Sequence, residues 1–297
     1  MDDLQQFLDP KVLAKVDNLE LVAKFIVQGF MTGLHRSPYH GFSVEFSAYR
    51  KYAQGDELKF VDWRVFGRTD KFYVKQFEET TNLNCYIALD VSESMRMADN
   101  GVSKFRYGCF IAAGLTYMML KQGDCVGLAA FRTGEVDFIP AARRAGHLAT
   151  VLGRLARITP AGKTDLGSGF VNLAGRIRSR SLIILISDLL AGPQQVIDTL
   201  KYFRYQNHEV IVFHVLTQAE LTFPFFKQTY FRDMETGQTV ITDPGSIRQE
   251  YIRLLQAHIQ RLKHECEERQ IDFLSLSTSD QLDQSLMTYL SKRAMFY

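Results

Sequence analysis

Asn84-Cys-Tyr-Ile-Ala-Leu-Asp90-Val-Ser92-Glu-Ser94 is the stretch on which our prediction of the fold depends. Residues 86–89 are apolar without alternation, which is typical of a strand covered on both faces in a parallel sheet. This apolar run ends in a carboxylate that is followed by two hydroxyls. Open α/β sheets place their binding sites just beyond the carboxyl ends of their strands, so these polar residues predict a binding site at that edge of the sheet.

The spacing of these three polar side chains suits a small, hard cation. In a turn that leaves a strand, residues i, i+2 and i+4 can converge, so Asp90, Ser92 and Ser94 can share one ion. Mg²⁺ fits such a set because it takes oxygen ligands and retains bound water. The competing interpretation is a helix start at which Ser92 or Ser94 caps backbone N–H groups. The pattern alone leaves both interpretations open.

Length and composition predict a globular protein of the cytoplasm. The 297 residues, 46% of them hydrophobic, allow one large domain with a small appendage. A net charge of +2 gives no global electrostatic case for nucleic acid or an anionic membrane. The four cysteines lack a C-x-x-C spacing, and we expect them to be reduced. The apolar stretch at residues 19–31 contains charges and is too short for a membrane span.

A second apolar strand repeats the pattern of the first. Residues 182–187 are unbroken by charge and are followed by a carboxylate, Asp188. The loop at residues 159–169 lies between the two strands and carries Thr164, with Thr159 as a nearby alternative. Part of this loop, Gly162-Lys163-Thr164, matches a phosphate-binding loop, but the upstream glycine is absent, which disfavours nucleotide binding.

The alternation of strands and helices predicts a doubly wound, mostly parallel α/β sheet, which we place at residues 81–297. A hairpin signal at Glu235-Thr236-Gly237 predicts a β-hairpin insertion at about residues 222–243. Residues 1–80 are expected to form a separate region. In it, Asp9-Pro10 begins one amphipathic helix that ends near residues 29–33, and a β-rich segment follows.

Five residues resemble the metal-ion-dependent adhesion site (MIDAS) of von Willebrand factor A-like domains: Asp90, Ser92, Ser94, Thr164 and Asp188. The resemblance covers the chain from about residue 83 to its carboxyl end. In that family the serines and the threonine offer hydroxyls, and the two aspartates neutralise the ion. The resemblance therefore implies that these five residues bind Mg²⁺ or Mn²⁺.

A second motif is more specific, and it reads Arg50-x-Tyr52-x-x-Gly55-Asp56-x-x-Lys59-x-Val61-Asp62-Trp63-x-x-x-Gly67-Arg68. It is similar to the hallmark of the bacterial domain of unknown function 58 family, whose members carry an A-like domain and are commonly encoded beside MoxR-type AAA+ ATPases. Lys59 and Gly67 stand where that family is expected to have arginine and alanine. Many relatives carry amino-terminal membrane helices, and without one we expect the soluble form of the family.

These resemblances imply binding without catalysis. With only two carboxylates among its ligands, a divalent ion retains exchangeable water positions, and an acidic residue of a partner can replace one of these waters. We therefore expect a non-enzymatic, metal-dependent protein-binding module with no catalytic residues. Its expected partners are a MoxR-type AAA+ ATPase, with a role in assembly, activation or remodelling, and client proteins that present an acidic residue.

Two alternatives compete with this interpretation. An aspartate-nucleophile phosphohydrolase would use Lys163 and Asp188, but it needs a carboxylate as general acid where this chain has Ser92. A metal-free scaffold would keep the fold and use Asp90 and Asp188 only to cap turns. Among the scattered histidines, we expect His214, in the apolar strand at residues 210–216, to be a hydrogen-bonded core residue. The mixed charges of residues 36–79 favour packing over nucleic-acid binding.

Overall fold

The computed structural model divides the chain into two compact units, one made of residues 1–34 and 83–297 and the other of residues 35–82. It describes residues 9–34, 49–51, 73–75, 84–133, 135–163, 167, 173–177, 179–190, 192–227 and 229–282. In the second unit, β1 (Tyr49–Lys51) pairs antiparallel with β2 (Tyr73–Lys75). Most of the Arg50 to Arg68 motif, including Trp63, lies outside the described residues.

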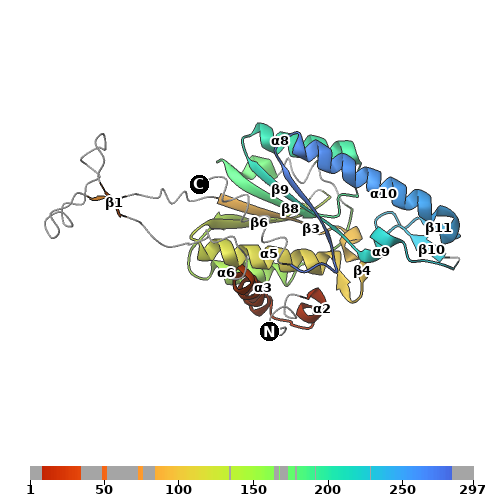
Figure 1. The fold of residues 1–297 in the computed structure, drawn as a ribbon, viewed down its shortest axis with the longest axis horizontal. Coiled ribbons are helices and arrows are strands. Elements are labelled where there is room, and N and C mark those ends of the chain that lie inside the picture. The colour runs from red at the N-terminus through yellow and green to blue at the C-terminus, as the bar shows by residue number, and fades with distance from the viewer. Residues whose placement is uncertain are drawn as a thin grey trace. The chain divides into compact units, whose positions relative to one another are not determined.

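A six-stranded sheet forms the centre of the first unit, with the order β12-β9-β8-β3-β6-β7 (Figure 1). All neighbours pair in parallel except β7, which runs antiparallel to β6. The strands are β3 (Asn84–Asp90), β6 (Cys125–Arg132), β7 (Glu135–Ala142), β8 (Ser181–Ser187), β9 (Glu209–Leu216) and β12 (Asp272–Ser277). The predicted doubly wound, mostly parallel α/β fold is confirmed.

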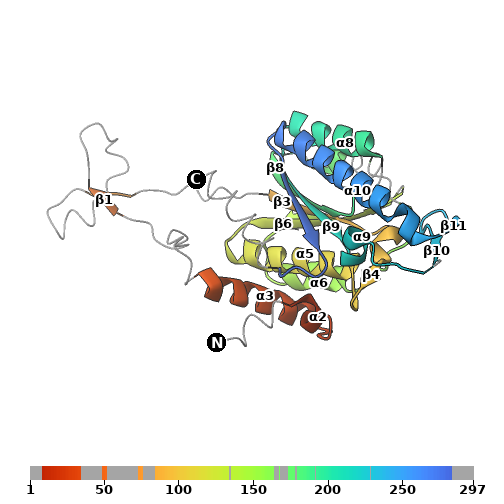
Figure 2. The same ribbon diagram turned by 45° about the vertical axis from the view of Figure 1, so that its right-hand side comes forward.

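Helices cover both faces of this sheet, as Figures 1 and 2 show. One face carries α5 (Lys104–Lys121) and α6 (His147–Leu155), and the other carries α8 (Pro193–Tyr205) and α10 (Pro244–Glu267). Two covered faces explain why β3 and β8 are apolar between their polar end residues, since every residue of β8 is buried. In the part of the chain that the structure describes, no helix is both long and apolar enough to cross a bilayer.

The described residues 9–34 form two helices where the sequence predicted one. Asp9 caps α2 (Pro10–Leu13) as expected, but this helix ends after one turn and α3 (Leu19–Leu34) begins separately. The break occurs because Asn18 accepts hydrogen bonds from the backbone N–H groups of residues 20 and 21, which caps the second helix. Helix α3 contacts α5, so it lies in the unit of the sheet and not with the β-rich segment with which the sequence pattern grouped it.

The predicted hairpin insertion is present as β10 (Thr229–Arg232) paired with β11 (Thr239–Thr242). An isolated two-stranded hairpin is at best marginally stable. Here the rings of Phe225, Phe231 of β10 and Tyr251 gather around Phe223, with centroid separations between neighbouring rings of 4.5–5.4 Å. This aromatic cluster attaches the hairpin to α10 and to the end of the short helix α9 (Gln218–Thr222).

The β6–β7 side of the sheet has two local irregularities. The register of this pair shifts between Val126 and Leu128, and β7 carries an exposed proline, Pro140. The shift surrounds Gly127, which is needed because a Cβ there would lie 2.6 Å from a ring carbon of Tyr86. The Tyr86 ring stacks on Phe138 of β7 at 5.7 Å, so the glycine makes room for an aromatic pair.

Candidate functional site

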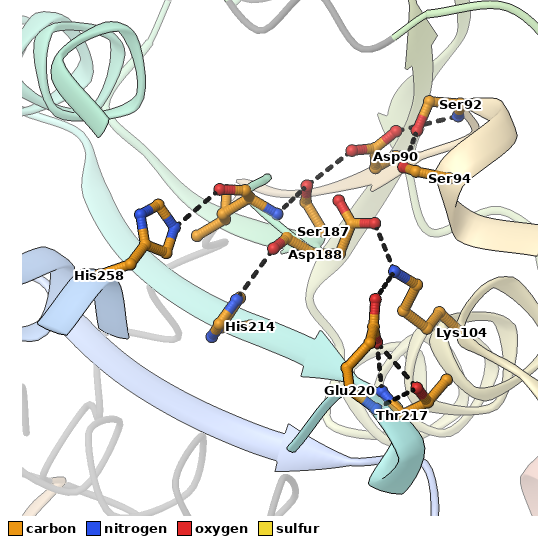
Figure 3. A network of polar contacts seen from close by, with 11 residues as sticks. Asp90, Ser92, Ser94, Lys104, Ser187, Asp188, His214, Thr217, Glu220 and His258 are labelled. Atoms are coloured by element: carbon orange, nitrogen blue, oxygen red, sulfur yellow. Dashed lines mark hydrogen bonds and ion pairs between the residues drawn. The ribbon is translucent and has the colours of Figure 1, made fainter. Parts of the chain in front are cut away.

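Two aspartates lie at the carboxyl ends of the two central strands. Asp90 is the last residue of β3, and Asp188 directly follows β8. These strands pair in parallel with Leu89 opposite Ile186, so their carboxylates reach the same edge of the sheet (Figure 3). Both side chains are fully buried. The structure thus brings together two of the predicted site residues that are 98 positions apart in the sequence.

The two predicted serines lie beside Asp90. Its Oδ1 accepts a hydrogen bond from the backbone N–H of Ser92 at 2.9 Å, and the hydroxyls of Ser92 and Ser94 are 3.0 Å apart. Ser92 occupies the N-cap position of a short 3₁₀ helix, η2 (Glu93–Arg96), but its side chain makes no capping hydrogen bond. Capping by Ser92, the competing interpretation of this motif, therefore does not account for its hydroxyl.

The environment of Asp90 opposes its negative charge. Burial, followed by the charge of Asp188, raises the pKa of Asp90 to about 7. Hydrogen bonds partly offset this effect, because Ser187 Oγ donates to Asp90 Oδ2 at 2.6 Å and Ser92 donates to Oδ1. Near neutral pH this carboxyl is consequently close to the point at which it gains or loses a proton.

A buried lysine, which no sequence pattern singled out, provides the counter-charge of Asp188. Lys104 Nζ lies 2.7 Å from Asp188 Oδ2 and 2.7 Å from Glu220 Oε1, and the lysine is 0% exposed (Figure 3). Burial alone would lower the pKa of Lys104, but the charges of Asp188 and Glu220 outweigh it, so the pKa is raised. Lys104 is therefore an ammonium enclosed between two carboxylates.

Glu220 is fixed by a capping box at the start of α9. Its Oε2 accepts hydrogen bonds from the backbone N–H and the hydroxyl of Thr217, at 2.7 and 2.9 Å. The Thr217 hydroxyl in turn accepts from the backbone N–H of Glu220. The pattern Thr217-x-x-Glu220 is a capping-box signature that could have revealed this short helix from the sequence. Nothing local marked its link to Lys104.

The turn that carries Asp188 is held by two histidines (Figure 3). His214 Nε2 lies 2.9 Å from the carbonyl oxygen of Asp188, and His258 Nε2 lies 3.1 Å from that of Leu189. Burial lowers the pKa of His214 to about 4, so its ring is neutral and can donate through Nε2. Leu189 has a φ of 48°, which is rare for a side chain with a Cβ. His214 is the hydrogen-bonded core residue that the sequence predicted.

The glycine-rich loop lies against the Asp90 turn. Ala161 N–H donates to the carbonyl of Val91, and Glu93 N–H donates to the carbonyl of Gly162, both at 2.9 Å. Thr164, the fifth predicted ligand, lies outside the described residues. Its alternative, Thr159, is described and exposed. The backbone contacts bring residues 161 and 162 of this distant loop to the site.

The donors present at this edge fit a hard divalent cation. Asp90, Asp188 and Glu220 with Lys104 leave two negative charges when all are ionised. Asp188 Oδ1 is buried without a hydrogen-bond partner among the residues described. Across the same residues, no group of three or more His, Cys, Asp or Glu side chains is placed to hold a metal, so an ion would need hydroxyl and water oxygens as well.

Comparisons with known proteins give a family and several similar structures. The family model described as "Protein of unknown function DUF58" matches residues 48–261. The uncharacterized protein Rv1480 of Mycobacterium tuberculosis is 28% identical over 255 residues, which cover 84% of this chain and 80% of that protein.

Similar solved structures include the conserved hypothetical protein BatB from Bacteroides thetaiotaomicron, with a TM-score of 0.49 and 21% identity over 72% of this chain and 99% of that chain. An aerotolerance-related membrane protein from Bacteroides fragilis has a TM-score of 0.48 and 19% identity over 71% and 99%. The SpRpn10 VWA domain has a TM-score of 0.43 and 14% identity over 69% and 93%.

Proposed function

Since this chain belongs to the family described as "Protein of unknown function DUF58", we propose that it is a non-enzymatic, divalent-metal-dependent protein-binding module. The observation that carries the proposal is the pair of buried carboxylates at the strand ends. Asp188 Oδ1 has no hydrogen-bond partner in the described part of the chain, and Asp90 shares the same edge with two hydroxyls. A buried, unsatisfied carboxylate oxygen is costly, and a bound cation would remove that cost.

The ligands we propose for Mg²⁺ or Mn²⁺ are Asp90, Ser92, Ser94 and Asp188, together with Thr164, which lies outside the described residues. When bound, the ion would supply exchangeable positions at which a carboxylate of a partner replaces water. The protein's own residues prepare the site: Ser187 and the Ser92 N–H orient Asp90, and His214 holds the Asp188 turn.

The partner we propose is a MoxR-type AAA+ ATPase, with which the module would act in assembly, activation or remodelling of client proteins. This part of the proposal derives from the resemblance of the Arg50 to Arg68 motif. A protein-binding role is supported by exposed apolar side chains on and beside the hairpin, where Phe226 is 78% and Tyr230 72% exposed.

The hairpin also extends toward the candidate site. The backbone N–H groups of Thr236 and Glu235 lower the pKa of Asp233 in the hairpin turn, and the charge of Lys163 adds to this effect at longer range. Lys163 belongs to the loop that contacts the Asp90 turn, so the hairpin turn lies near that loop. A partner that reached the metal would then meet the hairpin as well.

The phosphohydrolase alternative receives less support. Ser92 stands where such an enzyme needs a general acid. The enzyme would also use Lys163 together with Asp188, but Lys163 is exposed. The ammonium beside Asp188 is instead Lys104, which is buried and paired with two carboxylates. We therefore propose no catalytic residue.

Calorimetric titration of Mg²⁺ and Mn²⁺ tests the metal. We expect saturable binding to the wild type and none to Asp90→Ala, with Asp198→Ala as the control because that carboxylate is exposed on α8. Binding that is equal in the wild type and Asp90→Ala would contradict the site. No binding in any protein, even with acetate supplied as a partner carboxylate, would favour the metal-free scaffold.

Capture of the partner tests the second half of the proposal. The protein would be immobilised and exposed to the purified MoxR-type ATPase of the same genome, with Mg²⁺ or with EDTA. We expect retention that requires Mg²⁺ and that Asp90→Ala abolishes while Asp198→Ala retains it. Retention that is equal with Mg²⁺ and with EDTA would show that the metal does not mediate this contact.

A further inference from the structure

Lys104 combines three properties that a structural lysine does not need. It is the first residue of α5, where the positive end of the helix dipole disfavours a cation. It is fully buried, at 0% exposure. Its ammonium forms ion pairs with two carboxylates from distant parts of the chain, and Nζ lies 2.7 Å from an oxygen of Asp188 and 2.7 Å from an oxygen of Glu220. Replacing a whole buried ion network with apolar side chains of similar volume is often neutral or stabilising in proteins, so the presence of this network calls for another explanation.

We infer that Lys104 is an internal counter-ion that sets the metal affinity of the proposed site and keeps it moderate. The inference rests on the proposed function. Lys104 contacts Asp188 Oδ2, whereas Oδ1 of the same carboxylate has no hydrogen-bond partner among the residues described. One carboxylate thus offers one oxygen to a resident cation and leaves the other for a second cation.

Electrostatics determines the direction of the effect. An ammonium and a divalent ion that share Asp188 repel each other, so Lys104 weakens binding of the ion. The same ammonium lets two carboxylates remain buried side by side when no ion is bound, which preserves the fold of the metal-free protein. Weak intrinsic binding would make a carboxylate from the partner necessary to complete the site.

Glu220 provides a test with the opposite sign. Its charge attracts both Lys104 and any ion at Asp188, but it also holds the ammonium in place through Oε1. Glu220→Gln removes one negative charge and leaves Lys104 paired with Asp188 alone. Lys104→Met removes the positive charge and retains the length of the side chain. Metal affinity should therefore rise in Lys104→Met and fall in Glu220→Gln.

The experiment is calorimetric titration of MnCl₂ into four proteins: the wild type, Lys104→Met, Glu220→Gln and the surface control Asp198→Ala. Circular dichroism melting in EDTA and in MnCl₂ would establish that each variant folds. We expect Lys104→Met to bind at least about tenfold more tightly than the wild type and Glu220→Gln at least about tenfold more weakly. We expect Asp198→Ala to match the wild type.

Equal or weaker binding by Lys104→Met would overturn the inference and leave the proposed metal site standing. If no protein binds Mn²⁺, both the inference and the proposed metal site fail. If Lys104→Met does not fold in EDTA, two results decide. Refolding on addition of MnCl₂ together with weaker binding by Glu220→Gln supports the inference, whereas binding by Glu220→Gln as tight as in the wild type overturns it.

Discussion

Asp90 should make the metal-free protein less stable as the pH rises, and Asp90→Asn should remove this dependence. A carboxyl whose pKa is higher in the folded than in the unfolded state binds more protons when folded. Its contribution to the free energy of unfolding is therefore largest below the unfolded pKa and decreases as the pH rises toward the folded pKa. For Asp90 this window runs from an ordinary value of 3.8 to about 7.

The size of the effect follows from the width of the window. Each pKa unit corresponds to about 1.36 kcal/mol, so the shift of Asp90 from 3.8 to about 7 is worth roughly 4 kcal/mol. The causes are the buried surroundings first and then the charge of Asp188. The amide side chain of the Asp90→Asn variant is uncharged at every pH and escapes this penalty.

Urea denaturation in EDTA, at intervals from pH 4 to pH 8, measures the effect. We expect the free energy of unfolding of the wild type to fall relative to that of Asp90→Asn by roughly 4 kcal/mol over this range. Other titrating groups cancel in the difference between the two proteins. Asp198→Asn is the matched control, since its carboxylate is exposed and its difference from the wild type should stay flat. A constant difference between the wild type and Asp90→Asn would refute the reasoning.

Three further substitutions test other parts of the structure. Gly127→Ala should lower the free energy of unfolding by about 1–3 kcal/mol in urea denaturation, because its Cβ would lie 2.6 Å from the Tyr86 ring. His214→Leu should cost about 1–3 kcal/mol by leaving the buried carbonyl of Asp188 unpaired, and thermal melting should show it. Thr217→Ala should cost about 0.5–2 kcal/mol by removing the capping box of α9, and it should speed amide hydrogen exchange in that helix.

The sheet and its two aspartates could be predicted because each has a local signal. The strands at residues 84–90 and 181–187 each contain an unbroken apolar run, at residues 85–89 and 182–186, and this is what burial on both faces of a parallel sheet requires. Parallel strands place their carboxyl ends at one edge, so Asp90 and Asp188 followed from strand direction alone. The position of His214 within an apolar strand likewise predicted that its side chain would be buried and hydrogen-bonded.

The ion network around Lys104 could not be predicted from local patterns. Lys104 and Glu220 are 116 residues apart, and only the tertiary fold brings them together. A lysine at the start of a helix is most often a solvated residue, so its burial has no signature in the sequence. The break before α3 was missed for a different reason: the apolar stripe continues across it, while one side chain, Asn18, interrupts the helix.

The proline in β7 affects how the molecule can associate. An edge strand with free N–H and C=O groups is a template on which another chain can add a strand, and this leads to aggregation or unintended pairing. Pro140 has no N–H to donate, and the register shift places it with Ala141 opposite Gly127 alone, a bulge that bends β7. The β7 border of the sheet is thereby a poor template for strand addition around residue 140.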